Sequence, residues 1–160
     1  MRFITSLMIC QVYVTSTTGL EHMNISIIKN HVSSLFSSSG LKVRKAAKTN
    51  TQTSSDYILM ITNLTEQYEQ VEYSTRHSVM LTMDVLVTSQ SESTAQQTMS
   101  KVHEVLFSTE LITGLLGQGI NVSSLKLLSV VDDNDPDTAI NTIMTTCQIN
   151  YIARPTNNGE

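Results

Sequence analysis

The densest group of ionisable side chains in the sequence is an acidic cluster in the string DDNDPD. Its members are Asp132, Asp133, Asp135 and Asp137. Carboxylates at alternate positions can converge on a hard cation, but an EF-hand calcium loop needs Gly at its sixth position and Glu at its twelfth. Counting from Asp133, those positions hold Thr138 and Met144. Two interpretations remain: a turn with solvated charges, or a patch that repels or orients a partner protein or binds magnesium weakly between subunits.

The four histidines lie on separate segments of the chain. His31 and His103 fall next to the apolar stripes of two predicted helices, which favours residues at the edge of a core over ligands or bases. Cys10 and Cys147 stand far apart and outside any C-x-x-C pair, so the sequence predicts no zinc site. Because Cys147 lies in an apolar, Thr-rich run, it is predicted to be a buried thiol.

No sequence motif for catalysis or phosphate binding is present. The glycines of GLLGQG follow a predicted helix, whereas a dinucleotide-binding loop follows a strand. The sequence also lacks a G-x-S-x-G elbow and an H-E-x-x-H motif. We therefore expect neither enzymatic activity nor a bound cofactor.

The composition favours strands and polar loops in a single domain. Charged residues make up 15% of the 160 residues and the net charge is -4, so the clustered Lys and Arg of a nucleic-acid footprint are missing. Thr suits strands, and Ser and Asn suit turns and caps. No stretch reaches 18 consecutive apolar residues, which excludes an integral membrane protein of the helical kind.

The segment before Met23 stands apart from the rest. Residues 1–22 start with MRFITSLMICQVYV, which is too short and too polar to span a bilayer. This segment is a secretory leader, an additional strand or a disordered extension, and Met23 is a second possible start. We expect one domain over residues 23–154 and a short tail over residues 155–160.

Two segments are predicted to be helical. In the first, apolar residues recur at steps of three and four from Ile25 to Phe36, and Gly40 offers a left-handed cap. In the second, Ser93 and Gln96 resemble a capping box before an apolar stripe that ends at Leu106. Residues 111–116 continue the apolar content, but Gly114, Gly117 and Gly119 are expected to make them a frayed turn that leads out of the helix.

Five segments are predicted to be strands. The clearest is residues 76–88, where apolar and polar residues alternate over 13 positions, as in a strand with one buried face. The others are residues 41–47, 56–63, 122–131 and 139–153. The order α-β-β-β-α-β-β indicates an α+β fold, with one mixed, mainly antiparallel sheet of about five strands and two helices packed on it.

The pattern around the long strand resembles that of a known protein family. Arg76, Leu81 and Val85 mark this strand, a helix follows at once, and the last strand ends in Tyr-Ile-Ala-Arg at Arg154. Together with the order of the elements, these features resemble tail terminator proteins of long-tailed bacteriophages, also called tail completion or head-tail joining proteins. The likeness covers residues 23–154.

The resemblance implies a virion protein that is assembled in the host cytoplasm and has no catalytic residues. Such a subunit forms a hexameric ring on the tail tube, ends tube growth and presents a surface to the head connector, while DNA passes through the lumen. Free strand edges suit this role, because unpaired edges are templates for association. Arg76, Arg154 and the four aspartates are the candidate interface or lumen residues. The alternative is a secreted or periplasmic binding module with a cleaved leader.

Overall fold

The computed structural model describes residues 21–44, 57–70, 77–135, 137 and 139–153. Within them, five strands form one sheet: β1 (Val43–Arg44), β2 (Ile58–Gln70), β3 (His77–Ser89), β4 (Asn121–Asp135) and β5 (Ile140–Ala153). Three helices accompany it: α1 (Glu21–Ser38), α2 (Glu92–Leu106) and α3 (Thr109–Gly117). The predicted α+β class is confirmed.

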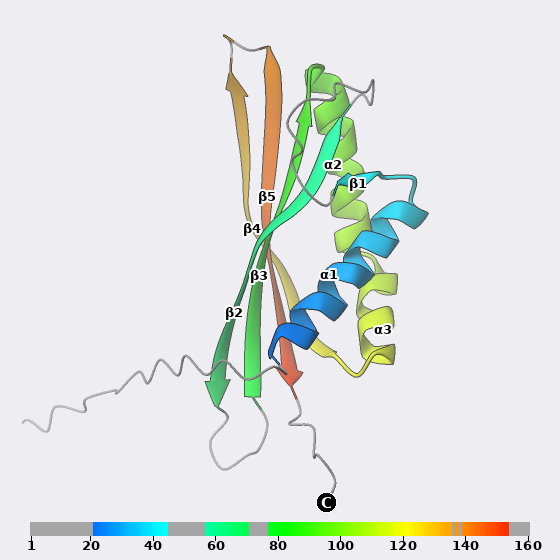
Figure 1. The fold of residues 1–160 in the computed structure, drawn as a ribbon, viewed down its shortest axis with the longest axis vertical. Coiled ribbons are helices and arrows are strands. Elements are labelled where there is room, and N and C mark those ends of the chain that lie inside the picture. Colours follow the sequence, from blue (N-terminus) through cyan, green and yellow to red (C-terminus); the bar gives the residue numbers. More distant parts are fainter. Residues whose placement is uncertain (1–20, 45–56, 71–76, 136, 138, 154–160) are drawn as a thin grey trace, which may run out of the picture.

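The sheet is antiparallel apart from one short strand. Its strand order is β1-β2-β3-β5-β4, and the two-residue β1 pairs in parallel with β2. All three helices lie on one side of the sheet, and the opposite face is left open (Figure 1). None of the helices in the described part of the chain has the length and apolar character needed to cross a bilayer.

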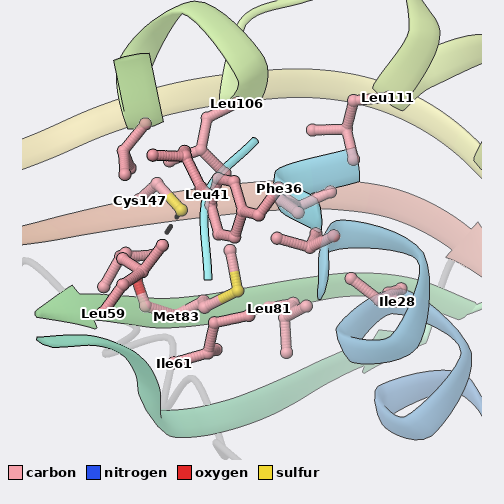
Figure 2. Close-up of a cluster of buried hydrophobic side chains, with 14 of the residues drawn as sticks. Ile28, Phe36, Leu41, Leu59, Ile61, Leu81, Met83, Leu106, Leu111 and Cys147 are labelled. Carbon is pink, nitrogen blue, oxygen red and sulfur yellow. Dashed lines mark hydrogen bonds between the residues drawn. The ribbon is translucent and has the colours of Figure 1, made fainter. Parts of the chain in front are cut away.

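The strand β3 organises the core. Its half-buried and buried side chains alternate from Ser78 to Ser89, which confirms the half-buried strand predicted at residues 76–88. Val79, Leu81, Met83, Val85 and Val87 are fully buried and belong to one core cluster with residues of the three helices. Side chains from β5 and from α1 to α3 complete this cluster, as Figure 2 shows for Cys147, Phe36, Leu106 and Leu111.

The ends of the first two helices follow local rules of capping. Gly40 has a φ of 80°, and the amide of Leu41 donates to the carbonyl of Phe36 at 2.8 Å, so the predicted glycine cap after α1 is confirmed. The predicted cap of α2 was placed two residues too late. Ser91, and not Ser93, is the N-cap, because its side chain accepts from the amide of Thr94.

The frayed turn predicted at residues 111–116 is wrong, because this stretch is the helix α3. Ser108 caps its start by accepting from the amide of Leu111, and Gly119, with a φ of 85°, ends it. The buried side chains of Leu111 and Leu115 attach the helix to the core. Tertiary packing therefore offsets the low helix propensity of its two glycines.

Gly114 allows α1 and α3 to approach each other closely. A Cβ atom at this position would overlap the imidazole of His31 on α1. Nδ1 of His31 also lies 3.3 Å from Nε2 of Gln118, next to the end of α3. The glycine therefore serves helix packing, although it weakens the helix itself.

We expect Gly114→Ala to destabilise the protein by about 1–3 kcal/mol, because the added methyl group must displace the His31 ring. Gly117→Ala is the matched control: its Cβ meets no atom within 4 Å, so the greater helix propensity of Ala leaves stability unchanged or raises it by up to about 1 kcal/mol. Urea unfolding measures both. The Gly114→Ala penalty should vanish in a His31→Ala background, and a penalty that persists there would contradict this explanation.

Candidate assembly surface

The strand β4 forms one edge of the sheet and exposes a run of large apolar side chains. The exposed fractions are 44% for Leu127, 50% for Leu128, 48% for Val130 and 45% for Val131. Val122 and Leu125, nearer the start of the strand, pack instead against the core. Clustered apolar side chains at this level of exposure mark an association surface more often than an ordinary surface.

The backbone of β4 is paired on one side. Its partner is β5, from Asn121 opposite Ile152 to Asp135 opposite Ile140, and no other strand of the described residues pairs with it. The outer edge therefore carries backbone donors and acceptors that a further strand can use. The pairing shifts at two points, between Val122 and Ser124 and between Leu127 and Ser129. Such bulges bend a strand and increase its twist.

An apolar row crosses the open face of the sheet and reaches this edge. Its members lie opposite one another on four neighbouring strands and are Met60, Leu86, Met144 and Val131. The first three are half-buried and Val131 is exposed. The apolar surface of the edge thus continues onto the face that no helix covers.

The next row on the open face is polar and joined by hydrogen bonds. The carboxylate of Asp84 accepts from Asn63 at 2.9 Å and from the hydroxyl of Thr146 at 2.7 Å. These bonds link β2, β3 and β5 across the open face and satisfy the charge. Asp84 therefore acts as a structural acceptor on this face.

The acidic cluster is not the turn that the sequence indicated. Asp132, Asp133 and Asp135 continue β4, since their backbone pairs with residues 140–143 of β5. Asp132 and Asp133 are exposed and, as successive strand residues, point to opposite faces of the sheet. Asp137 is exposed in the turn that follows. Within the described residues, no group of three or more His, Cys, Asp or Glu side chains could hold a metal ion.

The two arginines predicted from the sequence as interface candidates, Arg76 and Arg154, lie outside the described residues. The sequence prediction of a strand at residues 122–131 did not identify the exposed run on β4. The sequence does contain a signal for it, since apolar residues occupy both odd and even positions of this strand: Leu127, Leu128, Val130 and Val131. A strand of this kind needs cover on both faces.

The predicted positions of His103 and Cys147 are confirmed. His103 is half-buried, its Nε2 lies 2.8 Å from the hydroxyl of Thr145, and burial lowers its pKa. Cys147 is fully buried and free, and burial followed by the charge of Asp84 raises the pKa of its thiol to about 12. Its thiol lies 3.6 Å from the carbonyl of Met83 (Figure 2). A thiol of this kind is a structural residue.

A carboxylate joins two tyrosines at the opposite end of the sheet from the acidic cluster. The hydroxyl of Tyr151 donates to Oε1 of Glu66 at 2.5 Å, and that of Tyr68 donates to Oε2 at 2.6 Å. Burial and the hydrogen bond to Glu66 raise the pKa of Tyr151. The bond spans β2 and β5 across the intervening β3, and so stabilises this end of the sheet.

A groove with a volume of about 360 Å³ lies between α1 and α2. Its lining includes Lys101, Glu104 and Glu110, together with three serines, but no histidine or cysteine. It therefore lacks the serine or cysteine paired with histidine that nucleophilic catalysis commonly uses.

The fold is similar to that of a virion protein. No protein-family model and no curated protein matches the sequence. Among solved structures, the chain is similar to one from the virion of the native gene transfer agent (GTA) particle, with a TM-score of 0.53 and 8% sequence identity. The match covers 81% of this chain and 92% of the other. At this identity the likeness concerns the fold.

We expect Tyr151→Phe to lower the free energy of unfolding by about 1.5–3 kcal/mol, because a partly buried hydrogen bond to a charged acceptor is lost. Tyr68→Phe is the matched control. Its side chain is 39% exposed, so water can replace the hydroxyl and the loss should stay below about 1 kcal/mol. Guanidinium unfolding followed by circular dichroism measures both, and equal losses would contradict the assignment.

Proposed function

We propose that this chain is a structural subunit of a phage-like virion and forms a ring where the tail tube meets the head. The observation that carries the proposal is the exposed apolar edge of β4, which joins unpaired backbone groups to four large side chains. An edge of this kind, left in water, is a site of association. A neighbouring copy that covers it buries apolar surface and pairs the backbone in one step.

The shape of the sheet supports a ring over a symmetric pair. β4 forms one border of the sheet, while the other border is formed by the two-residue β1 and the part of β2 beyond it. Contacts between two different surfaces of identical subunits are head-to-tail, and they generate a ring when the rotation closes. The low charge of the chain reduces repulsion between copies.

The fold comparison supports a virion role. The similar chain comes from a virion, and the match spans most of both chains. In the proposed ring, one surface contacts the tail tube protein, another contacts the head connector or neck protein, and DNA passes through the lumen. The protein is then a component of the tail or neck, assembled in the host cytoplasm, and performs no catalysis.

The acidic end of β4 is proposed to face the lumen. Asp132 and Asp133 are exposed, and Asp137 is exposed in the adjoining turn. Negative charge around a channel discourages DNA from adhering to its wall, because the phosphate backbone carries the same sign. Their role is therefore repulsion of DNA and not the coordination of a metal ion.

Replacing Leu128 and Val130 with lysine should disrupt the ring. Each side chain contributes about 1–2 kcal/mol of apolar burial, so the double change weakens association by about 30- to 700-fold. Light scattering during size-exclusion chromatography, native mass spectrometry and negative-stain images measure the assembly. Rings from the double variant that match those of the wild type would contradict the proposal, as would a wild-type monomer at every protein and magnesium concentration.

The matched control carries Gln97→Lys and Ser100→Lys, two exposed positions on α2. This variant gains the same charge and should assemble like the wild type. Circular dichroism and melting temperature should show that both variants retain the wild-type fold. Loss of rings in the control as well would assign the effect to net charge instead of the edge.

Neutralising the acidic end should make the ring retain DNA. We expect rings in which Asp132, Asp133, Asp135 and Asp137 are replaced by Asn to bind duplex DNA at low salt in a gel-shift assay, and wild-type rings to leave it free. The control replaces four exposed glutamates with Gln: Glu69, Glu92, Glu104 and Glu110. Both variants change the formal charge by the same amount, from -4 to 0 (-4 + 4 = 0). Equal DNA binding by both, or by neither, would contradict the lumen assignment.

A further inference from the structure

We propose that residues 2–14 of one copy form a strand that pairs antiparallel with the outer edge of β4 in the neighbouring copy. This inference rests on the proposed ring and names the segment that covers its exposed edge. We call residues 2–14 the arm. It precedes the described residues, which begin at Glu21.

The edge of β4 requires a partner that is apolar on both faces. Leu127 lies opposite the buried Cys147 and so belongs to the helix-covered face, whereas Val131 lies opposite Met144 and belongs to the open face. An added strand presents alternate side chains to the two faces. A strand with a single apolar face would leave half of the exposed side chains in water.

The arm has this double pattern. Its odd positions include Phe3, Leu7, Ile9 and Tyr13, and its even positions include Ile4, Met8, Val12 and Val14. Most of these are β-branched or aromatic residues, which favour strands. The 13 residues of the arm also match the length of β4, which has 15.

Charge favours the antiparallel direction. Arg2 is the one charged residue among residues 1–20, and β4 ends in Asp132, Asp133 and Asp135. An antiparallel arm brings Arg2 beside these carboxylates, whereas a parallel arm brings it beside Asn121. Opposite charges on neighbouring strands stabilise one pairing over the other.

The position of α1 agrees with this direction. Its first turn and the start of β4 lie at the same end of the sheet (Figure 1). Val14 is seven residues before Glu21, so it lies within about 25 Å of the helix start. The end of the arm can therefore reach the start of a β4 edge, and its beginning then runs back towards the acidic end.

A ring requires that the arm pairs with β4 of the neighbouring copy and not with β4 of its own copy. An arm on its own β4 would complete that sheet and leave the edge closed to other copies. An arm and an edge that belong to different copies form a head-to-tail contact, which each subunit repeats once with the next subunit. The exchanged arm would form main-chain hydrogen bonds of the kind found in other strand-addition complexes.

Disulfide trapping between two different variants tests the exchange. One full-length protein carries Leu7→Cys, and a second carries Leu128→Cys, both with Cys10→Ser. Cys147 is retained, because its buried thiol with a pKa of about 12 does not compete. Partner proteins with Leu127→Cys, Val130→Cys or Val131→Cys are tested as well, because the bulges in β4 shift the register of an added strand. The two proteins are mixed, dissociated, reassembled and oxidised.

We expect a covalent dimer that contains one chain of each kind, in at least a quarter of the chains for the best position between 127 and 131, where random mixing of equal amounts allows at most half. Ser100→Cys, on the exposed face of α2, is the matched control and should give less than one tenth of that yield. Native mass spectrometry records in parallel whether each mixture forms rings.

The outcomes separate this inference from the proposed function. Rings without a covalent dimer at any of the edge positions overturn the arm exchange and leave the ring intact. A chain carrying both Leu7→Cys and Leu128→Cys that closes its disulfide within one molecule overturns the exchange, because the arm then pairs with its own edge. Absence of both rings and covalent dimers overturns the exchange and the proposed function together.

Discussion

The burial of one face of a long antiparallel sheet under three helices governs the rest of this structure. β3 supplies the centre of that face, where every second side chain from Val79 to Val87 is removed from water. Three helices fit over β2, β3 and β5 more fully than over the far half of β4. Because the cover is one-sided and does not extend that far, the molecule is left with an open face and an apolar border.

This incomplete cover unites features that would otherwise need separate explanations. The apolar row across the open face, the exposed run from Leu127 to Val131 and the unpaired backbone of β4 all meet at one border. The exposed apolar surface is concentrated along a strand and not in a concave site. The surface is therefore better suited to binding a copy or another protein than to binding a small substrate.

The fold could be predicted where one physical rule acted alone. The alternation in β3 fixed its buried face, and Gly40 fixed the end of α1. The prediction of α3 failed because its glycines weaken a helix locally, while the packing of Leu111 and Leu115, and the closeness of Gly114 to His31, depend on distant residues. The aspartates were assigned to a turn because their types favour turns, but pairing with β5 extends β4 through them.

The connectivity of the strands also determines at what point during synthesis the sheet can be completed. β3 occupies the centre of the sheet, yet its second neighbour is β5, the last of the described strands, and α2, α3 and β4 lie between β3 and β5 in sequence. Distant pairing of this kind is slow to form, since a long loop must close first. The sheet therefore cannot be completed before β5 has been synthesised, and until then β3 lacks one of its two neighbours. The outer edge of the sheet at β4 therefore does not take its final form until β5 has been made.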